Sequence, residues 1–419
     1  MKGRVCEPYS GVPAPGLPYL CGPPYIGANY ILYPAYCIST LDRLLLRLYH
    51  EIGVFAQPKL DLPGIKLNSS ISSKRFQILA LSGGGYRGLY TAEILKRLEQ
   101  ENGGEPLARR FDLIAGTSVG GILALGLACE IPAARLVEVF ENHGATIFNR
   151  NSIIGALSRH SRFVDRVLYG LTSARYRASG LRQVLEQADL FSTHLLDQSL
   201  HPVIVPAVNY STGTARVFKT PHHPDFRQDH RRSLVEIALA TSAAPVYFPH
   251  HVIDDQIYVD GGLVANGPAL LALHEAETFF LKGIADVHVL SIGTIETNAT
   301  ASTQRRLNKG ILSWGKDLFT LTIAAQERLL NQILSHRLTE SRHLRIDTRL
   351  EKDQANDVGM DVVTPAATQA LKGQAANSFQ WVINDGRLRA ILAHVPPAHT
   401  FYYGKRANVQ VKEGGTNHA

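Results

Sequence analysis

A serine flanked by glycines stands between two apolar segments in residues 111–128 of this chain. The segment before the serine predicts a short buried strand, and the segment after it predicts a buried helix. Ser118 would then occupy a tight strand-to-helix turn, where Gly116 and Gly120 tolerate crowding because they carry no Cβ. Such a turn exposes the hydroxyl at a helix N-terminus, where backbone amides favour developing negative charge. The pattern predicts a nucleophile elbow; a glycine–serine helix cap is the alternative.

A second glycine-rich turn precedes this one. Residues 76–81 predict a strand and residues 89–100 predict a helix, and the turn between them has the spacing G-x-G-x-x-G. The turn consists of Ser82, Gly83, Gly84, Gly85, Tyr86, Arg87 and Gly88. Together with the strand before Ser118, it predicts a βαβ unit and therefore a parallel sheet.

The same spacing fits a dinucleotide-binding fingerprint, which is a weak signal when it stands alone. That fingerprint needs an acidic residue ~20 positions later at the end of a strand. Glu105 is instead followed by Pro106, in an expected loop. We therefore expect the glycine amides to face Ser118 and to donate hydrogen bonds to an oxyanion. Arg87 is expected to anchor this loop or an anionic substrate.

An Asp-Gly-Gly sequence ends a third predicted strand. Residues 257–259 form this strand, and Asp260, Gly261 and Gly262 follow it. A carboxylate in this position, with glycines behind it, can approach a neighbouring loop closely; a tight turn is the alternative. Further strands are predicted at residues 203–208, 215–219 and 287–293, and helices at 233–241 and 269–279.

Composition limits the class of protein. The 419 residues are 45% hydrophobic and 19% charged, as in a globular chain with one large domain, alone or with an appendage. The formal net charge of +7 suits an anionic membrane surface, a nucleotide or a nucleic acid. Four scattered cysteines predict neither a disulfide scaffold nor a zinc site, and a reducing cytoplasm is the expected location. We expect no signal peptide and, without a run of ~18 apolar residues, no membrane span.

The segments outside the motifs differ in character. Residues 1–37 predict an irregular arm rich in proline and tyrosine, and residues 38–56 an amphipathic helix that packs on the core or on a second subunit. Residues 318–338 and 369–393 predict long helices. The segment 150–182 is basic, and indicates either a solvated helical face or a surface for lipid headgroups or a nucleotide. Its arginines are Arg150, Arg159, Arg162, Arg166, Arg175, Arg177 and Arg182.

The three motifs in this order, with Ala243-Ala244-Pro245 ahead of the aspartate, resemble the patatin-like phospholipase family. The resemblance covers about residues 76–295 and implies a three-layer α/β/α fold with a largely parallel sheet. It also implies a Ser–Asp dyad that hydrolyses lipid acyl esters, with Ser118 as nucleophile and Asp260 as base. The other positions that it implies are the oxyanion loop with Gly83, Gly84, Gly85, Arg87 and Gly88, the elbow glycines Gly116 and Gly120, and the motif glycines Gly261 and Gly262. No cofactor or metal is required, because the carboxylate takes the serine proton directly.

The stretch 76–85 is also similar to bacterial members of the family that act in antiphage signalling, in which a cyclic dinucleotide switches the phospholipase on. Such a switch implies a gated enzyme. A phospholipase in the cytoplasm also meets its own cell's membrane at all times, so we expect it to be gated, and to be peripheral at the inner membrane when active. The implied partners are a phospholipid surface and a cyclic dinucleotide activator. No nucleic-acid partner is implied, and a homo-oligomer stays open.

The motifs leave two alternatives to the Ser–Asp dyad open. The first alternative is an α/β-hydrolase with a Ser-Asp-His triad that uses His274 or His288. The second is a nucleotide-binding regulator without hydrolysis, in which the glycine turn cradles phosphates.

The expected division of the chain is an arm and amphipathic helix in residues 1–70, a patatin-like phospholipase domain in 76–295, and a helical C-terminal segment with a tail in 300–419.

Overall fold

The computed structural model describes residues 75–149, 174–296, 311–350 and 358–407. All of these residues belong to one compact unit that spans residues 71–419. The expectations for the arm and for the helix at 38–56 lie outside the described residues. The same is true of the first four arginines of the basic segment, since residues 150–173 are not described.

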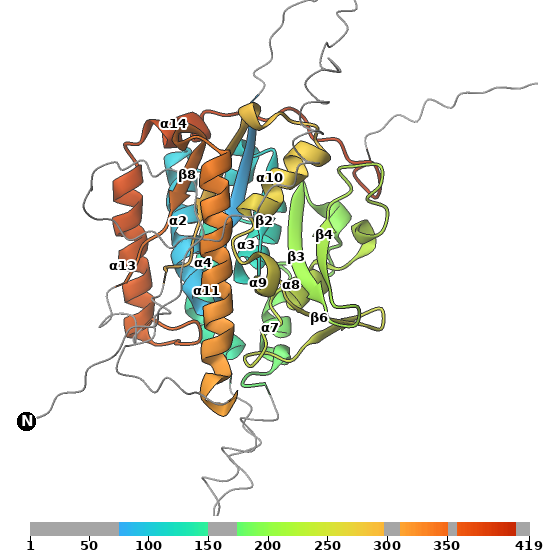
Figure 1. The fold of residues 1–419 in the computed structure, drawn as a ribbon, viewed down its shortest axis with the longest axis vertical. Coiled ribbons are helices and arrows are strands. Elements are labelled where there is room, and N and C mark those ends of the chain that lie inside the picture. Colours follow the sequence, from blue (N-terminus) through green and yellow to red (C-terminus); the bar gives the residue numbers. More distant parts are fainter. Residues whose placement is uncertain (1–74, 150–173, 297–310, 351–357, 408–419) are drawn as a thin grey trace, which may run out of the picture. The chain divides into compact units, whose positions relative to one another are not determined.

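A mixed sheet, with eight strands among the described residues, forms the centre of the unit (Figure 1). The strands are β1 (Phe76–Leu81), β2 (Leu113–Gly116), β3 (Val203–Asn209), β4 (Thr214–Lys219), β5 (His251–Ile253), β6 (Gln256–Asp260), β7 (Val287–Ile292) and β8 (His343–Ile346). Strands β3, β2, β1, β7 and β8 lie side by side in this order and are parallel. The predicted βαβ unit is therefore confirmed, with β1 paired directly to β2.

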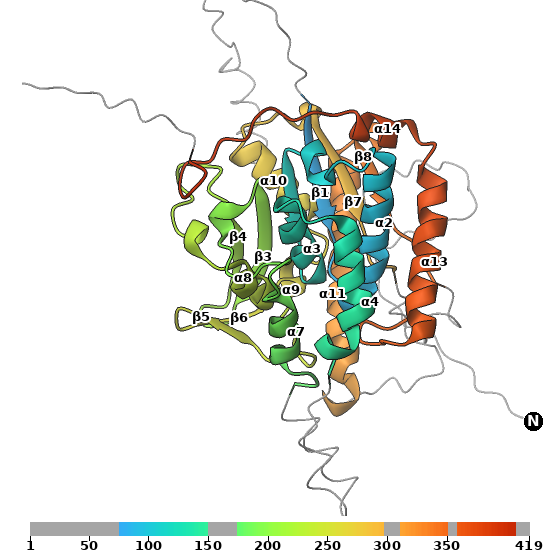
Figure 2. The ribbon, with the colours of Figure 1, turned by 180° about the vertical axis from the view of Figure 1, so that it is seen from behind.

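Helices cover both faces of the sheet, as Figures 1 and 2 show from opposite sides. One face carries α2 (Gly88–Glu101), α3 (Val119–Ala128), α4 (Ala133–Ile147), α7 (Ala178–Leu185), α8 (Leu234–Thr241), α13 (Pro365–Val382) and α14 (Gly386–Leu392). The other face carries α10 (Ala269–Thr278) and α11 (Ile311–Arg337). This arrangement confirms the predicted three-layer α/β/α fold.

Strand β1 shows why both faces must be covered. Leu79 and Leu81 point into the core under α2 and α3, whereas Phe76, Ile78 and Ala80 point into the second core under α10 and α11. Successive side chains of a strand point to opposite faces, so a strand that is apolar on both needs a layer of helices on each. All six residues of β1 are buried.

The C-terminal part of the chain is joined to this sheet. The expected helices are present, but a strand that the sequence did not predict, β8, pairs in parallel with β7. Helix α13 packs against α2. The stretch 369–393 is not one helix, because α13 ends at Val382 and the Asp385 side chain accepts a hydrogen bond from the Arg387 amide, which caps α14.

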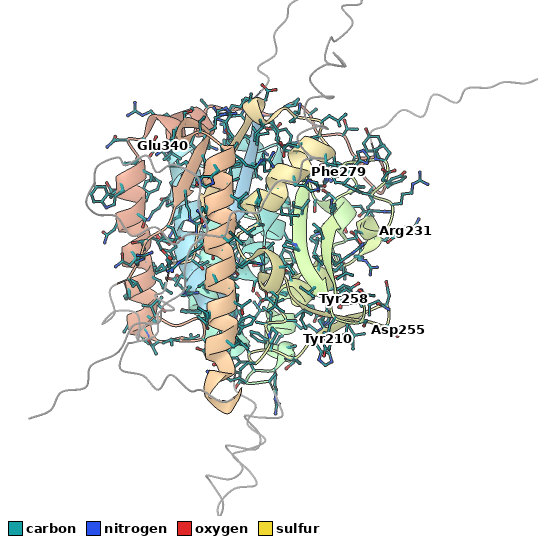
Figure 3. The ribbon with its side chains drawn as sticks, in the orientation of Figure 1. Tyr210, Arg231, Asp255, Tyr258, Phe279 and Glu340 are labelled. Carbon is teal, nitrogen blue, oxygen red and sulfur yellow. The ribbon has the colours of Figure 1, made fainter. Side chains whose placement is uncertain are left out.

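Strand β3 brings the ends of two other strands together. One edge of β3 pairs with β4 along its length. The other edge pairs first with β2, where Ala115 faces Ile204, and then with β6, where Asp260 faces Ala207. Because β2 and β6 share this edge, the end of β6 lies just beyond the end of β2. Figure 3 labels Asp255 in the turn of the β5–β6 hairpin, and Glu340 just before β8 at the far side of the molecule.

Candidate active site

Ser118 occupies the turn between β2 and α3, as the sequence predicts. Its backbone has φ 54° and ψ −127°, a conformation that L-residues adopt only when the surroundings hold it. The Ser118 amide donates to Thr241 Oγ1 at 3.0 Å, which helps to fix the turn. A Cβ on Gly116 would collide with the Gly120 carbonyl, and one on Gly120 with the Leu81 carbonyl. Both elbow positions therefore require glycine because the chain passes so close.

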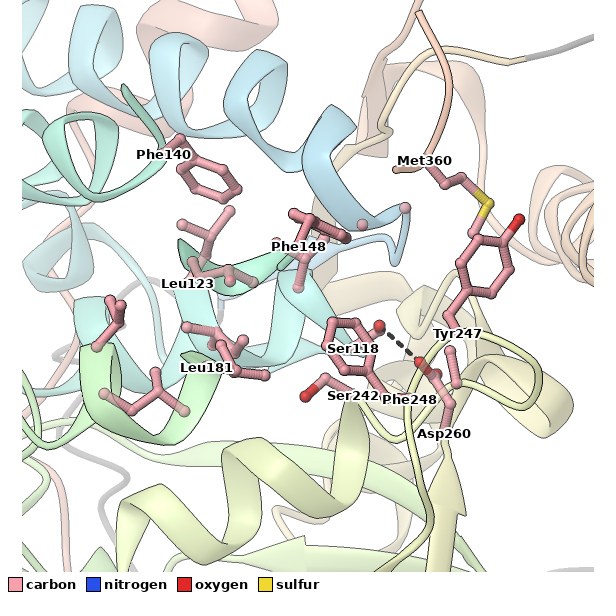
Figure 4. Close-up of a pocket in the computed structure, with 18 of the residues that line it drawn as sticks. Ser118, Leu123, Phe140, Phe148, Leu181, Ser242, Tyr247, Phe248, Asp260 and Met360 are labelled. Atoms are coloured by element: carbon pink, nitrogen blue, oxygen red, sulfur yellow. Dashed lines mark hydrogen bonds between the residues drawn. The ribbon is translucent and has the colours of Figure 1, made fainter. Parts of the chain in front are cut away.

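Asp260 ends β6 and contacts the serine directly. Ser118 Oγ donates a hydrogen bond of 2.7 Å to Asp260 Oδ2 (Figure 4). The other carboxylate oxygen, Oδ1, accepts from the Gly262 amide at 2.6 Å, so the Asp-Gly-Gly motif orients its own aspartate. A Cβ on Gly261 would collide with the Pro206 carbonyl of β3. The structure thus brings together two residues that lie 142 positions apart in the sequence.

The environment of Asp260 suits a general base. Its side chain is 3% exposed, and burial raises the pKa of its carboxyl to about 6, against the opposing effect of the hydrogen bonds from Gly262 and Ser118. A base with a pKa near the working pH is ionised at neutrality and still takes up a proton readily. Asp260 therefore has both the position and the basicity to remove the Ser118 proton.

We expect the pH profile of kcat/KM to report this carboxyl. Asp260 must be ionised to accept a proton, so activity on a soluble ester is expected to be constant above the pKa of about 6 and to fall about tenfold per pH unit below it. Initial rates between pH 4.5 and 8.5 measure this, with circular dichroism at each pH to check that the fold persists. A profile that is flat down to pH 5 would contradict the assignment.

Neither histidine of the alternative triad reaches the serine. His274 lies on α10 and its ring pairs with the Thr278 hydroxyl, and His288 lies on β7 in a separate pocket with Arg75. Among the described residues, no histidine lines the pocket that contains Ser118. The Ser118 hydroxyl instead donates directly to a carboxylate.

The glycine turn after β1 lies against the serine. The Gly83 amide is engaged by the Asn266 carbonyl at 3.0 Å. The Gly83 carbonyl accepts from Thr294 Oγ1 at 2.8 Å and Asn266 Nδ2 at 3.3 Å. Gly84 and Gly85 line the same pocket as Ser118, and their amides have no hydrogen-bond partner in the described part of the chain. The turn thus offers two amides to a developing oxyanion, while Gly83 holds it in place.

Arg87 and Gly88 support this turn from behind. Arg87 is buried and donates to the Gly84 carbonyl at 3.4 Å and to the Ile295 carbonyl at 3.0 Å. Gly88 starts α2, where a Cβ would collide with Val119 of α3. Of the two expected roles of Arg87, these contacts show the first, the anchoring of the loop.

Ser118 and Asp260 line an apolar pocket. It runs between α3, α4 and α7, and Figure 4 shows Leu123, Phe140 and Leu181 on one side of Ser118, with Tyr247 and Met360 on the other. Its cavity is about 80 Å³, whereas sites that hold drug-sized ligands measure ~300–1,000 Å³. The lining suits an aliphatic chain, but in this conformation the side chains fill most of the space.

Three residues that contact the site were not predicted as site residues. Asn266 and Thr241 hold the glycine turn and the serine. The carbonyl of Met360 accepts from the Tyr86 amide at 2.8 Å, and it lies where a Cβ on Gly85 would be. The Asn266-Gly267-Pro268 sequence could have indicated more than a helix start. Met360 carries no sequence signal.

The described residues contain neither a candidate metal site nor a membrane-spanning helix. No group of three or more His, Cys, Asp and Glu side chains there could hold a metal ion. Likewise, no helix in the described ranges is long and apolar enough to cross a bilayer.

Comparisons with known proteins agree with this geometry. Residues 79–273 match the family model described as patatin-like phospholipase. A "cGAMP-activated phospholipase" of Pseudomonas aeruginosa is 44% identical over 80% of this chain and 97% of its own length. Proteins of the same name from Vibrio cholerae and Escherichia coli are 35% and 34% identical, over 68% and 82% of this chain and 85% and 99% of their own lengths.

The chain belongs to the patatin-like phospholipase family. This membership confirms the predicted family and the predicted class of enzyme, a lipid acyl hydrolase. In this patatin-like phospholipase the three motifs of the sequence meet at one place. They are the turn after β1, the elbow after β2 and the aspartate at the end of β6.

Proposed function

We propose that this patatin-like phospholipase hydrolyses acyl esters of membrane phospholipids with a Ser118–Asp260 dyad, and that cGAMP or a related cyclic dinucleotide activates it. The observation that carries the first part is the 2.7 Å hydrogen bond between Ser118 Oγ and Asp260 Oδ2, both of which line an apolar pocket. A serine hydroxyl is a weak nucleophile until a base takes its proton, and Asp260 is placed to do this.

The chemistry follows from the positions of these groups. Ser118 Oγ attacks the ester carbonyl carbon while its proton moves to Asp260 Oδ2. The carbonyl oxygen becomes an oxyanion near the amides of Gly84 and Gly85, and the N-terminus of α3 favours the same charge. The leaving alcohol takes the proton from Asp260 as the carbon–oxygen bond breaks. Water then attacks the acyl-enzyme, gives its proton to Asp260, and releases the fatty acid as Ser118 recovers a proton.

Activation by a ligand is supported by the pocket and by the names of the relatives. The three relatives are named cGAMP-activated phospholipases. The apolar pocket at the dyad, which we call the acyl pocket, is nearly filled by its own side chains. Beside it, the rings of Phe148, Tyr176 and Phe248 pack on one another with centroids 5.4–5.8 Å apart. A filled pocket must open before a long acyl chain binds. A ligand opens it to the extent that it binds the open state more tightly.

The basic segment 150–182 stays a candidate surface for lipid headgroups or a nucleotide. In its described part, Arg175 is paired with Asp361, and Arg182 with Glu186 and Glu236. Peripheral binding to the inner face of the membrane, a cytoplasmic location and self-association are further parts of this proposal. The charge of +7 favours contact with anionic lipid.

Three assays test the proposal together. Fatty-acid release from liposomes of anionic and zwitterionic phospholipids is expected to rise when cGAMP is added, and a soluble ester is expected to show the same stimulation without a membrane. A fluorophosphonate probe should label wild-type protein but not Ser118→Ala. Full activity without nucleotide on both substrates would contradict the gating, and absence of labelling and of release under every condition would contradict the hydrolysis.

A further inference from the structure

A second cavity, larger and more polar, lies beside the acyl pocket. Its volume is about 690 Å³, within the ~300–1,000 Å³ that small-molecule sites occupy. It lies beyond the carboxyl ends of β1, β7 and β8 and under α11, which Figure 1 shows in front of the sheet. In open α/β sheets, ligands bind at the carboxyl ends of the strands.

The lining of this cavity combines cations and carboxylates. Its four arginines are Arg87, Arg328, Arg345 and Arg349, and its three carboxylates are Glu296, Glu327 and Asp347. Arginine forks bind phosphate oxygens, and guanidinium planes stack on nucleobases. Carboxylates accept hydrogen bonds, and guanine and adenine each carry an amino group that donates them. A ligand with two phosphodiesters and two purines presents all of these groups at once.

Arg328, Arg345 and Arg349 already form ion pairs. An anionic ligand would therefore replace the carboxylate partner of an arginine rather than neutralise an unpaired cation. Arg328 and Arg349 both pair with Glu296, at 2.5 and 2.8 Å. Arg345 pairs with Glu327 at 2.9 Å. The side chains of Arg328 and Arg349 are 48% and 58% exposed. They can therefore turn toward a phosphate at little cost, since exposed ion pairs contribute little stability.

The cavity is connected to the catalytic loop by direct contacts. Glu327 accepts from Ser82 Oγ at 2.8 Å and from Asn266 Nδ2 at 2.7 Å. Asn266 in turn holds Gly83. Arg87, which lines the cavity, donates to the Gly84 carbonyl.

The two cavities also share part of their walls, because Asn266, Ile323 and Met360 line both. A ligand that moved Ile323 or Met360 in one cavity would change the space in the other. It would also act on the glycine turn, since the Met360 carbonyl accepts from the Tyr86 amide.

We propose that this polar cavity binds the phosphates and base edges of the activating cyclic dinucleotide. The inference rests on the proposed function, because it assigns a place to the ligand named there. Binding takes Arg328 and Arg349 from Glu296 and presses on α11 and Met360. The glycine turn and the acyl pocket then adopt the arrangement that accepts substrate.

Two variants and a matched control of the full-length chain test the assignment. Arg328→Glu combined with Arg349→Glu reverses two charges, and Asn331→Trp fills the cavity without a change of charge. The control is Arg109→Glu, an arginine of similar exposure, 51%, that pairs with Glu105 and Glu130 elsewhere on the surface. Calorimetric titration with 3′,3′- and 2′,3′-cGAMP gives the affinity. Hydrolysis of a soluble ester and of phospholipid vesicles, each with and without nucleotide, gives the stimulation ratio for each substrate.

We expect wild type and Arg109→Glu to bind cGAMP and to be stimulated equally. The double arginine variant should bind at least ~10²-fold more weakly, as loss of two charged contacts implies. Asn331→Trp should also bind more weakly, because the indole occupies the space that the ligand needs. Both cavity variants should show a stimulation ratio near one. Melting temperatures close to that of wild type identify the variants as folded. If Asn331→Trp alone is folded, it decides the outcome.

Three results would overturn the inference in distinguishable ways. Wild-type affinity and stimulation in both cavity variants would place the nucleotide elsewhere. Normal stimulation on the soluble ester, with a loss confined to phospholipid vesicles, would make the cavity a lipid headgroup site. A wild-type protein that neither binds cGAMP nor responds to it would contradict the proposed activation itself.

Discussion

Ser118→Ala and Asp260→Asn are each expected to lower the turnover of a chromogenic ester by on the order of 10⁴-fold or more, and the double variant should be no slower than the slower single variant. Groups that act as one unit lose their effect together. The 2.7 Å contact between the two side chains makes them such a unit. Single-turnover kinetics on the two single variants and the double variant measures this. Near wild-type turnover by Asp260→Asn would contradict the dyad.

The stability of Asp260→Asn provides the control for this experiment. The folded-state pKa of Asp260 is about 6, raised from the ordinary value of 3.8 by burial. Its contribution to stability is therefore present below the ordinary value and is lost as the pH rises through about 6. Two pKa units correspond to on the order of 3 kcal/mol. Asp260→Asn removes this penalty, so its melting temperature at pH 8 should exceed that of wild type, with a smaller difference at pH 4. Inactivity together with a higher melting temperature excludes misfolding as the cause.

Gly85→Ala is expected to reduce turnover by ~10²–10³-fold, the usual effect of losing one oxyanion donor. Gly85 has φ +60°, and a Cβ there would collide with the Met360 carbonyl, so the loop and its amides must shift. Gly84→Ala should act similarly through contact with the Thr294 side chain. Steady-state kinetics on a soluble ester measures the loss in kcat.

Gly103→Ala is the matched control for the glycine variants. Gly103 also has a positive φ, +73°, but no atom lies within 4 Å of a Cβ placed on it. It therefore reproduces the backbone strain of Gly85→Ala without moving the loop. Equal kinetics in Gly85→Ala and wild type would remove the turn from the oxyanion site. Equal losses in Gly85→Ala and Gly103→Ala would assign the effect to global stability.

The local parts of the site were predictable from the sequence because each is formed by a few residues that lie close together in the chain. Gly116 and Gly120 predict the elbow of Ser118, and the strand–turn–helix pattern at Gly83 predicts the βαβ unit. The pairing of Ser118 with Asp260 is different. It depends on β2 and β6 sharing one edge of β3. Only the resemblance to a family indicated it, since no local pattern records which strands become neighbours.

The walls of the two cavities were less predictable. The acyl pocket is built from α3, α4 and α7, whose apolar faces look like any core-forming helix in sequence. Met360 and β8 come from the segment beyond residue 300, where parallel pairing with β7 joins residues that are far apart in the chain. Arg328 and Arg349 meet at Glu296 for the same reason. Such contacts follow from topology rather than from local preference.

Because β2 and β6 share one edge of β3, the nucleophile and the base lie on elements that differ in the free energy needed to open them locally. Ser118 follows β2, a central strand that lies between β3 and β1. Asp260 ends a hairpin strand that pairs with β3 through three residues, with two further backbone bonds from Asp260 and Gly261 to the end of α8 and the residues after it. Short edge elements open with less free energy than the centre of a sheet. We therefore expect warming to separate the base from the serine before the core melts, so that inactivation precedes global unfolding.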